Sequence, residues 1–239
     1  MPQAVASPVD GYVDALGQVG GEQVSAVYAV GSLALDDFSA KQSNVDLVVV
    51  GDPRLDVSQR RWLRRAERSL RRAGRPAQVW HTNWEEVAGG PDAVEEPSPL
   101  ATPMTWTILR NDPMPLRGPD WPVSWTDQDV LRRWALERLR ALAAGPNGLL
   151  VLRRDVGPLV LEAARLAHMA ITGRVLSKSE AGESITGIVS SRHRRVVVDS
   201  VGYRQGAQTS MYWGPFERKY DALALVRDLL HAADDSAGS

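Results

Sequence analysis

Two apolar segments near the start of the chain constrain the fold most strongly, because both have the pattern of buried strands. VSAVYAVG covers residues 24–31 and VDLVVVG covers residues 45–51, and each ends at a glycine. Continuous apolar runs of this length, rich in β-branched residues, are typical of strands inside a sheet. A third strand is predicted at AQVWHT, residues 77–82, after an amphipathic helical segment at residues 57–73. This alternation predicts a sheet domain at the start of the chain.

Helical periodicity takes over in the second half of the chain. Before it, we expect a short helix at residues 12–19, and PMTWTILRND at residues 103–112 as a further strand or the last piece of the sheet domain. Capping residues, apolar stripes and glycine stops then predict successive helices. The pattern predicts an α/β (α+β) fold, with a mixed sheet in residues 1–120 and an all-helical domain in residues 121–239. The predicted helices of the second domain cover residues 126–145, 157–173, 177–189, 191–206 and 215–234.

Composition excludes several classes of function. The net charge of −1 over 239 residues is unlike that of a general nucleic-acid binder. The absence of cysteine excludes disulfides and cysteine-based zinc sites, and the four histidines lack ligand spacing. The N-terminus has no basic flank with an apolar core, and no apolar run is long enough to span a bilayer. We expect a cytoplasmic protein with neither a nucleic acid nor a membrane as partner.

Other features have both a functional and a structural interpretation. The arginines between residues 54 and 75 fit a phosphate-binding or RNA-binding surface, but we favour a solvated helix face. His81 can serve as a base at the end of the third strand, although a strand-end histidine without a catalytic role is favoured. The eight tryptophans are expected to pack in cores, with one or two stacking on a ring-shaped ligand.

A Gly-Ser turn follows the first strand. Gly31 allows a phosphate to approach the backbone closely, and the hydroxyl of Ser32 and the following amides can donate hydrogen bonds to it. On the next strand, Asn44 and Asp46 are two residues apart and therefore face the same side. We expect these two side chains to project together beside the Gly-Ser turn.

This arrangement resembles the nucleotidyltransferases of the DNA polymerase beta type, whose motif is Gly-Ser followed by Asp-x-Asp on the next strand. It is most similar to the aminoglycoside adenylyltransferases that modify streptomycin and spectinomycin. The segments LVLEAARLAHMAITGRVLSKSEAG and VVVDSVGYRQG also resemble the helical second domain of that branch. The resemblance therefore covers most of the chain and includes motifs in both predicted domains.

The resemblance implies a site and its ligands. ATP and Mg²⁺ would be the cofactors, and a small hydroxylated molecule would bind in a cleft between the two domains. A lysine ammonium would act as a point charge toward the triphosphate. The roles carried over are nucleotide phosphate binding by Gly31 and Ser32, metal binding by Asp46, triphosphate binding by Lys178, and a position near the nucleotide for Tyr203.

The sequence departs from the family pattern at two of three acidic positions. The first metal-binding aspartate falls at Asn44, and the carboxylate that acts as general base falls at Gln78. No Asp or Glu occurs from Arg75 to Trp84, so a small alignment shift does not restore the base. Mg²⁺ prefers charged oxygen ligands, and an amide cannot accept a proton. Ordinary Mg-ATP nucleotidyl transfer is therefore predicted to be weakened or lost, with Asp46 as the remaining acid.

Three functions stay open on the sequence alone. The first is an active adenylyltransferase in which another carboxylate substitutes for the missing acids. The second is a repurposed, metal-independent enzyme of natural-product metabolism. The third is a non-catalytic protein that binds a small molecule. The carboxylates considered as substitutes are Asp36, Asp37, Glu85, Glu86, Glu95 and Glu96.

Overall fold

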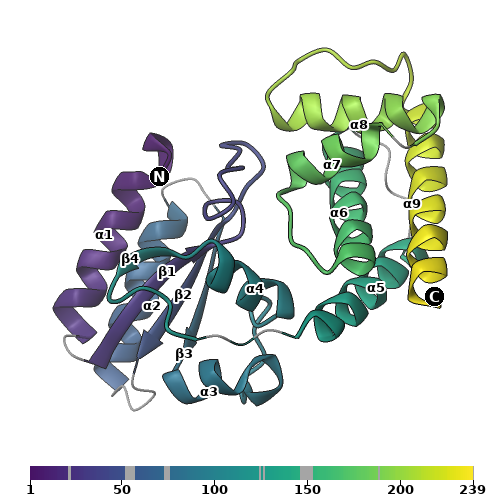
Figure 1. The fold of residues 1–239 in the computed structure, drawn as a ribbon. Helices are drawn as coiled ribbons and strands as arrows, with labels where there is room; N and C mark the ends of the chain where they lie inside the picture. The colour runs from purple at the N-terminus through teal and green to yellow at the C-terminus, as the bar shows by residue number, and fades with distance from the viewer. Residues whose placement is uncertain are drawn as a thin grey trace. The chain divides into compact units, whose positions relative to one another are not determined.

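A computed structural model of the chain consists of two compact units, Met1–Thr126 and Asp127–Ser239, which are described separately here (Figure 1). Among the residues that the structure describes, all the strands lie in the first unit, and the second is built from helices. The structure describes residues 1–20, 23–51, 57–72, 76–123, 125, 127–145, 153–187 and 189–238.

The first unit is built on a four-stranded sheet in the order β3-β2-β1-β4. The central strand β1 pairs antiparallel with both β2 and β4, whereas β2 pairs parallel with β3. The sheet is therefore mixed, as the sequence predicts. The strands are β1 at Val24–Val30, β2 at Val45–Gly51, β3 at Ala77–Thr82 and β4 at Met114–Arg117.

Helices α1 (Gln3–Gly20) and α2 (Val57–Arg72) cover one face of this sheet (Figure 1). Their apolar stripes, which include Leu16 and Leu63, pack in one core with Val27 and Leu47 of the central strands. The arginines of α2 lie on its opposite side, where the described side chains are exposed. Side chains alternate between the two faces of a strand, so every second residue of β1 and β2, including Val27 and Leu47, faces these helices.

Tryptophans form the core on the other face. Trp80 of β3 lies 5.0 Å from Trp106 between ring centroids, and Trp106 is 1% exposed and donates its indole N–H to the Val87 carbonyl at 2.9 Å. Trp84, Trp121 and Trp125 pack against the same core. The helical elements on this side are α3 at Trp84–Gly89, the short 3-10 helix η2 at Pro91–Ala93, and α4 at Pro103–Asn111.

The structure corrects two expectations about the first unit. Residues 103–111 form helix α4 and not a strand, because Thr102 caps its first turn and Pro103 occupies a position where a helix tolerates proline. The fourth strand is instead Met114–Arg117, which carries no long apolar run. Helix α1 is also longer than the predicted residues 12–19 and begins at Gln3.

The second unit is a bundle arranged around α6. Helix α6 contributes a nearly continuous set of buried residues, including Val160, Ala164 and Met169, and it packs against each of the other four helices. Residues 126 and 188, at the edges of two predicted helices, lie outside the described residues. The helices are α5 at Gln128–Ala144, α6 at Arg153–Thr172, α7 at Lys178–Thr186, α8 at Ser191–Arg204 and α9 at Pro215–Ala237.

The predicted fold class is confirmed: a mixed sheet with covering helices is followed by a helical region. Among the described residues, no helix has both the length and the apolar character needed to cross a membrane.

Candidate functional site

Asp46 and Gln78 lie side by side at the end of the sheet where β2 and β3 begin, which we call the Asp46 edge. They are register partners in the parallel pair of β2 and β3, so their Cα atoms are about 5 Å apart across the ladder. Asp46 is also the register partner of Val30, the last residue of β1. Both side chains are half-buried. The sheet topology therefore brings the predicted acid and the predicted base position to the end of β1, where the Gly-Ser turn begins.

Gly31 packs directly against Asp46. Its φ is 64°, a conformation that favours glycine, and a Cβ at this position would lie 2.9 Å from Oδ2 of Asp46. Two independent constraints, a backbone angle and a close approach, thus require glycine here. Asp46 therefore lies beside the Gly-Ser turn, as the sequence predicts.

The segment after Gly31 forms one helical turn that ends at Asp36. The amide of Leu35 donates to the Gly31 carbonyl at 3.1 Å, and the amide of Asp37 donates to the Ser32 carbonyl at 2.9 Å. Asp36 has a φ of 48°, which lies in the left-handed region. A residue in this conformation ends a helix in the Schellman motif. The first amides of a helical turn have no acceptor within the turn, so this turn presents donors near Ser32.

Asn44 lies one residue before β2 and is half-buried. The next residue, Val45, donates its amide to the Pro76 carbonyl at 2.9 Å, which ties the start of β2 to the segment leading into β3. Asn44 is therefore placed at the same edge as Asp46 and Gln78. The three residues placed here are therefore two amides and one carboxylate.

Most carboxylates considered as substitutes lie elsewhere. Gln78 is at the start of β3, whereas Glu85 and Glu86 follow the end of that strand. The four residues from Gln78 to Thr82 alone span about 13 Å along the strand. Asp36 is exposed. Asp37 is half-buried and donates its amide to the Ser32 carbonyl at 2.9 Å, so its role as a substitute stays a prediction.

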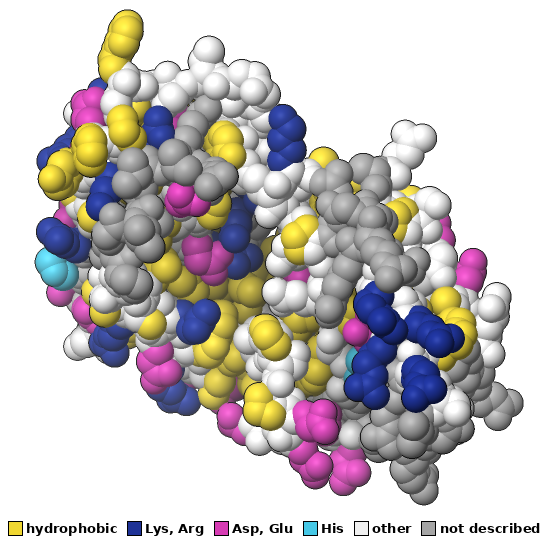
Figure 2. Space-filling view, turned by 180° about the vertical axis from the view of Figure 1, so that it is seen from behind, with side chains coloured by type: hydrophobic (Ala, Val, Ile, Leu, Met, Phe, Trp, Pro, Cys, Tyr) yellow, Lys and Arg dark blue, Asp and Glu magenta, His cyan; other side chains and the backbone are white. Residues whose placement is uncertain are grey.

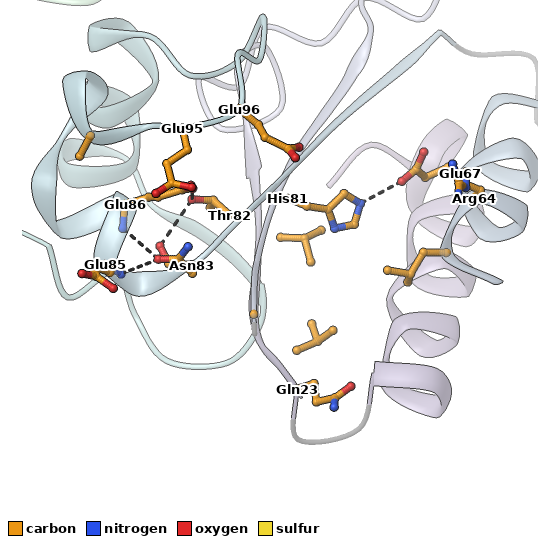
Figure 3. A pocket seen from close by; sticks show the side chains of 15 residues that line it. Gln23, Arg64, Glu67, His81, Thr82, Asn83, Glu85, Glu86, Glu95 and Glu96 are labelled. Carbon is orange, nitrogen blue, oxygen red and sulfur yellow. Dashed lines mark hydrogen bonds and ion pairs between the residues drawn. The ribbon is translucent and has the colours of Figure 1, made fainter. Parts of the chain in front are cut away.

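A cavity of about 850 Å³ occupies the opposite end of the sheet (Figure 3). Glu95 and Glu96 line it together with Glu85 and Glu86, which separates all four from the Asp46 edge. His81 also points toward this cavity, with Nε2 at 2.9 Å from Oε1 of Glu67 (Figure 3). His81 is therefore distant from the predicted site.

Lys178 begins α7 in the second unit, directly after the Ser177 N-cap. Its Nζ lies 3.1 Å from Oε2 of Glu162 on α6. The guanidinium of Arg165 donates to both oxygens of the same carboxylate, at 2.9 and 2.7 Å, and Arg165 is only 9% exposed. Lys178 is therefore part of a cluster of two cations around one carboxylate.

The pKa of Glu162 reports the strength of this cluster. Burial alone would raise this pKa, but Arg165 and Lys178 outweigh the effect and lower it to about 2. Sequence reasoning did not single out Glu162 or Arg165, although Arg165 is the arginine in the Ala-Arg helix motif. The i, i+3 spacing of the two residues on a helix was the available signal.

Tyr203 lies near the end of α8 and packs on α6. A Cβ on Gly157 would lie 3.3 Å from Cδ1 of the Tyr203 ring, so the small residue leaves room for this ring. Gly157 and Glu162 are five residues apart, which is about 7.5 Å along the helix axis. Lys178 and Tyr203 therefore contact neighbouring turns of α6 within the second unit.

The donor set at the Asp46 edge does not fit a catalytic Mg²⁺ site of the usual kind. Mg²⁺ in phosphoryl-transfer sites is bound through carboxylates, and Asn44 and Gln78 supply neutral oxygens. Among the residues that the structure describes, no group of three or more His, Asp and Glu side chains can hold a metal ion.

Comparison with known proteins identifies the fold. No protein-family model and no curated protein sequence matches the chain. Among solved structures, the chain is similar to a spectinomycin adenyltransferase, AAD(9), from Enterococcus faecialis, solved with ATP and spectinomycin. The TM-score is 0.69 over 95% of this chain and 98% of that one, at 14% sequence identity. The chain therefore has an aminoglycoside nucleotidyltransferase-like fold.

Proposed function

We propose that the chain is a nucleotide-binding protein of the nucleotidyltransferase fold in which Mg-dependent nucleotidyl transfer is weak or lost. The observation that carries the proposal is the pairing of Asp46 with Gln78 directly beside Gly31. We infer that positions 44, 46 and 78 correspond to the three acidic positions of the family's motif, with one acid in place of three. Its second ligand would be a small hydroxylated molecule, and the place where that ligand binds stays a prediction.

Support for nucleotide binding comes from three sides. The similar structure, AAD(9), was solved with ATP. The turn after Gly31 supplies backbone donors next to Ser32. Lys178 and Arg165 together carry more positive charge than the single carboxylate of Glu162 offsets. A triphosphate can therefore compete with Glu162 for these cations.

The loss of transfer follows from the amides. Without a carboxylate at position 78, no group there accepts the proton of an attacking hydroxyl, and general-base catalysis contributes about 10²–10⁴-fold to rate. Without a carboxylate at position 44, a bound metal would lose one charged ligand. Either change alone slows the reaction, and both affect the same step.

Isothermal titration with ATP tests this proposal directly. We expect the protein to bind ATP with an affinity that Mg²⁺ changes little. The double variant Asn44→Asp, Gln78→Glu should acquire Mg²⁺-dependent binding, with an affinity at least about tenfold higher in Mg²⁺ than in EDTA.

A matched control variant, Asn83→Asp with Asn111→Asp, adds the same charge to the first unit outside the site and should keep the wild-type behaviour. Absence of ATP binding at millimolar concentration in both the wild type and the double variant would refute nucleotide binding. Strongly Mg²⁺-dependent nucleotidyl transfer by the wild-type protein would refute the weakened metal chemistry.

A further inference from the structure

Four large apolar side chains are exposed in the loop between α8 and α9 and in the first turns of α9. Met211 is 51% exposed, Trp213 103%, Phe216 65% and Tyr220 64%. We call these four residues the aromatic platform. They make up more than half of the exposed large hydrophobic residues in the described part of the chain, although they fall within ten positions. In Figure 2, hydrophobic side chains stand clear of the surface at the upper left edge.

Buried polar contacts fix the loop that carries the platform. Asp199, which is 2% exposed, accepts hydrogen bonds from the Ser210 hydroxyl and the Met211 amide, both at 2.8 Å. Arg218 donates to the Ser210 hydroxyl at 3.1 Å and lies 3.5 Å from the Asp199 carboxylate. The loop is therefore anchored at residues 210 and 211.

Tyr212 anchors the middle of the loop. Its ring is buried, and its hydroxyl donates to Asp221 at 2.8 Å. The guanidinium of Arg195 lies 4.1 Å above the ring centroid, which is cation–π geometry. Because the loop is already ordered, the exposed side chains beside Tyr212 lose little conformational entropy when a partner covers them.

The charged groups beneath the platform are balanced. Arg192 and Arg195 both bind the buried carboxylate of Asp221, and Arg195 also binds Glu217. Arg218 is held by Asp199. Three arginines thus face three carboxylates, so these six groups add no net charge that would repel a second copy of the surface.

The exposed area matches the requirement of a small symmetric dimer. A large side chain of this kind covers about 150–250 Å², so the four exposed fractions amount to about 430–700 Å² in one copy. That is the size of the largest apolar patch found on typical monomers. A twofold interface would bury about 860–1,400 Å² in total, around the lower bound of specific interfaces.

We propose that the aromatic platform is a twofold interface through which the protein binds a second copy of itself. Trp213 and Phe216 are its anchors, since large aromatic side chains dominate the binding energy of such interfaces. The same patch meets itself across the axis, so one substitution removes two contacts. We expect dissociation in the micromolar range, because small interfaces are usually weak and transient. This inference does not depend on the nucleotide-binding proposal.

Sedimentation equilibrium of the full chain from about 1 to 200 μM tests the interface. We expect a monomer–dimer equilibrium in the wild type. In the variant Trp213→Ser, Phe216→Ser the dissociation constant should rise at least about tenfold, because truncation of an anchor commonly costs a factor of this size or more. Both side chains are exposed, so the variant should fold, and circular dichroism checks this.

The matched control is Ile171→Ser, which removes an exposed apolar side chain, 38% exposed, at the end of α6. This control should dimerise like the wild type. A wild-type protein that stays monomeric at 200 μM overturns the proposal. A dimer that persists unchanged in the double variant also overturns it, because the interface would then lie elsewhere.

Discussion

Substitution of Gly31 by alanine is the sharpest test of how the site is built. Gly31 combines a φ of 64° with a neighbour, Oδ2 of Asp46, that lies 2.9 Å from the position of an added Cβ. A residue with a Cβ costs roughly 1–2 kcal/mol in the left-handed conformation. The added contact then forces the Asp46 carboxylate to move. Together these effects should destabilise the first unit by about 1–3 kcal/mol.

The matched control lies in the same unit and has the opposite sign. Gly11 is in the interior of α1, and nothing lies within 4 Å of a Cβ built on it. Gly11→Ala should therefore stabilise the protein by about 0.5–1 kcal/mol, because alanine is the better helix former. Both variants add one methyl group, so their difference isolates the conformation and the contact.

Urea unfolding followed by near-ultraviolet circular dichroism provides the assay, since five tryptophans of the first unit pack around one core. We expect the midpoint for Gly31→Ala to fall and that for Gly11→Ala to rise, with similar slopes. ATP affinity should also fall in Gly31→Ala, because Asp46 is displaced. If Gly31→Ala were as stable as the wild type, neither the positive φ nor the close approach would exist in solution.

Two further predictions concern other parts of the two units. Asp36 ends the turn after the Gly-Ser pair with a φ of 48°, so Asp36→Gly should stabilise the first unit by about 0.5–1 kcal/mol. The same urea assay measures this change. A loss of stability would show that the aspartate side chain contributes more than the backbone strain costs. Glu162 has a pKa lowered to about 2 from 4.5, so its ion pairs contribute stability that is present above pH 4.5 and is lost as the pH falls toward 2. Glu162→Gln should lower the free energy of unfolding at pH 7 by about 1–3 kcal/mol, a range that allows for solvent screening because the side chain is 28% exposed. The variant should also show a flatter dependence of stability on pH between pH 4.5 and 2. Identical acid profiles for the two proteins would contradict the ion-pair cluster.

The sequence predicted the elements that have strong local signals. The apolar runs of β1 and β2 and the helix starts marked by capping residues are properties of a few neighbouring positions, so they can be found without the fold. Residues 103–112, which were expected to be a further strand or the last piece of the sheet domain and form a helix, show the limit of such signals. A short run with apolar and β-branched residues suits both a buried helix and a strand, and only the cap at Thr102 and the packing of Trp106 decide between them.

By itself, the sequence determined which residue types stand at the site: one aspartate at position 46 with amides at positions 44 and 78. The tertiary structure decided which of the remaining carboxylates are near it. Strand direction places Glu85 and Glu86 at the far end of β3, and the register of β2 with β3 joins Asp46 to Gln78. It also formed the cluster around Glu162 and left Trp213 exposed. These features depend on contacts between residues distant in sequence, and local patterns do not encode such contacts.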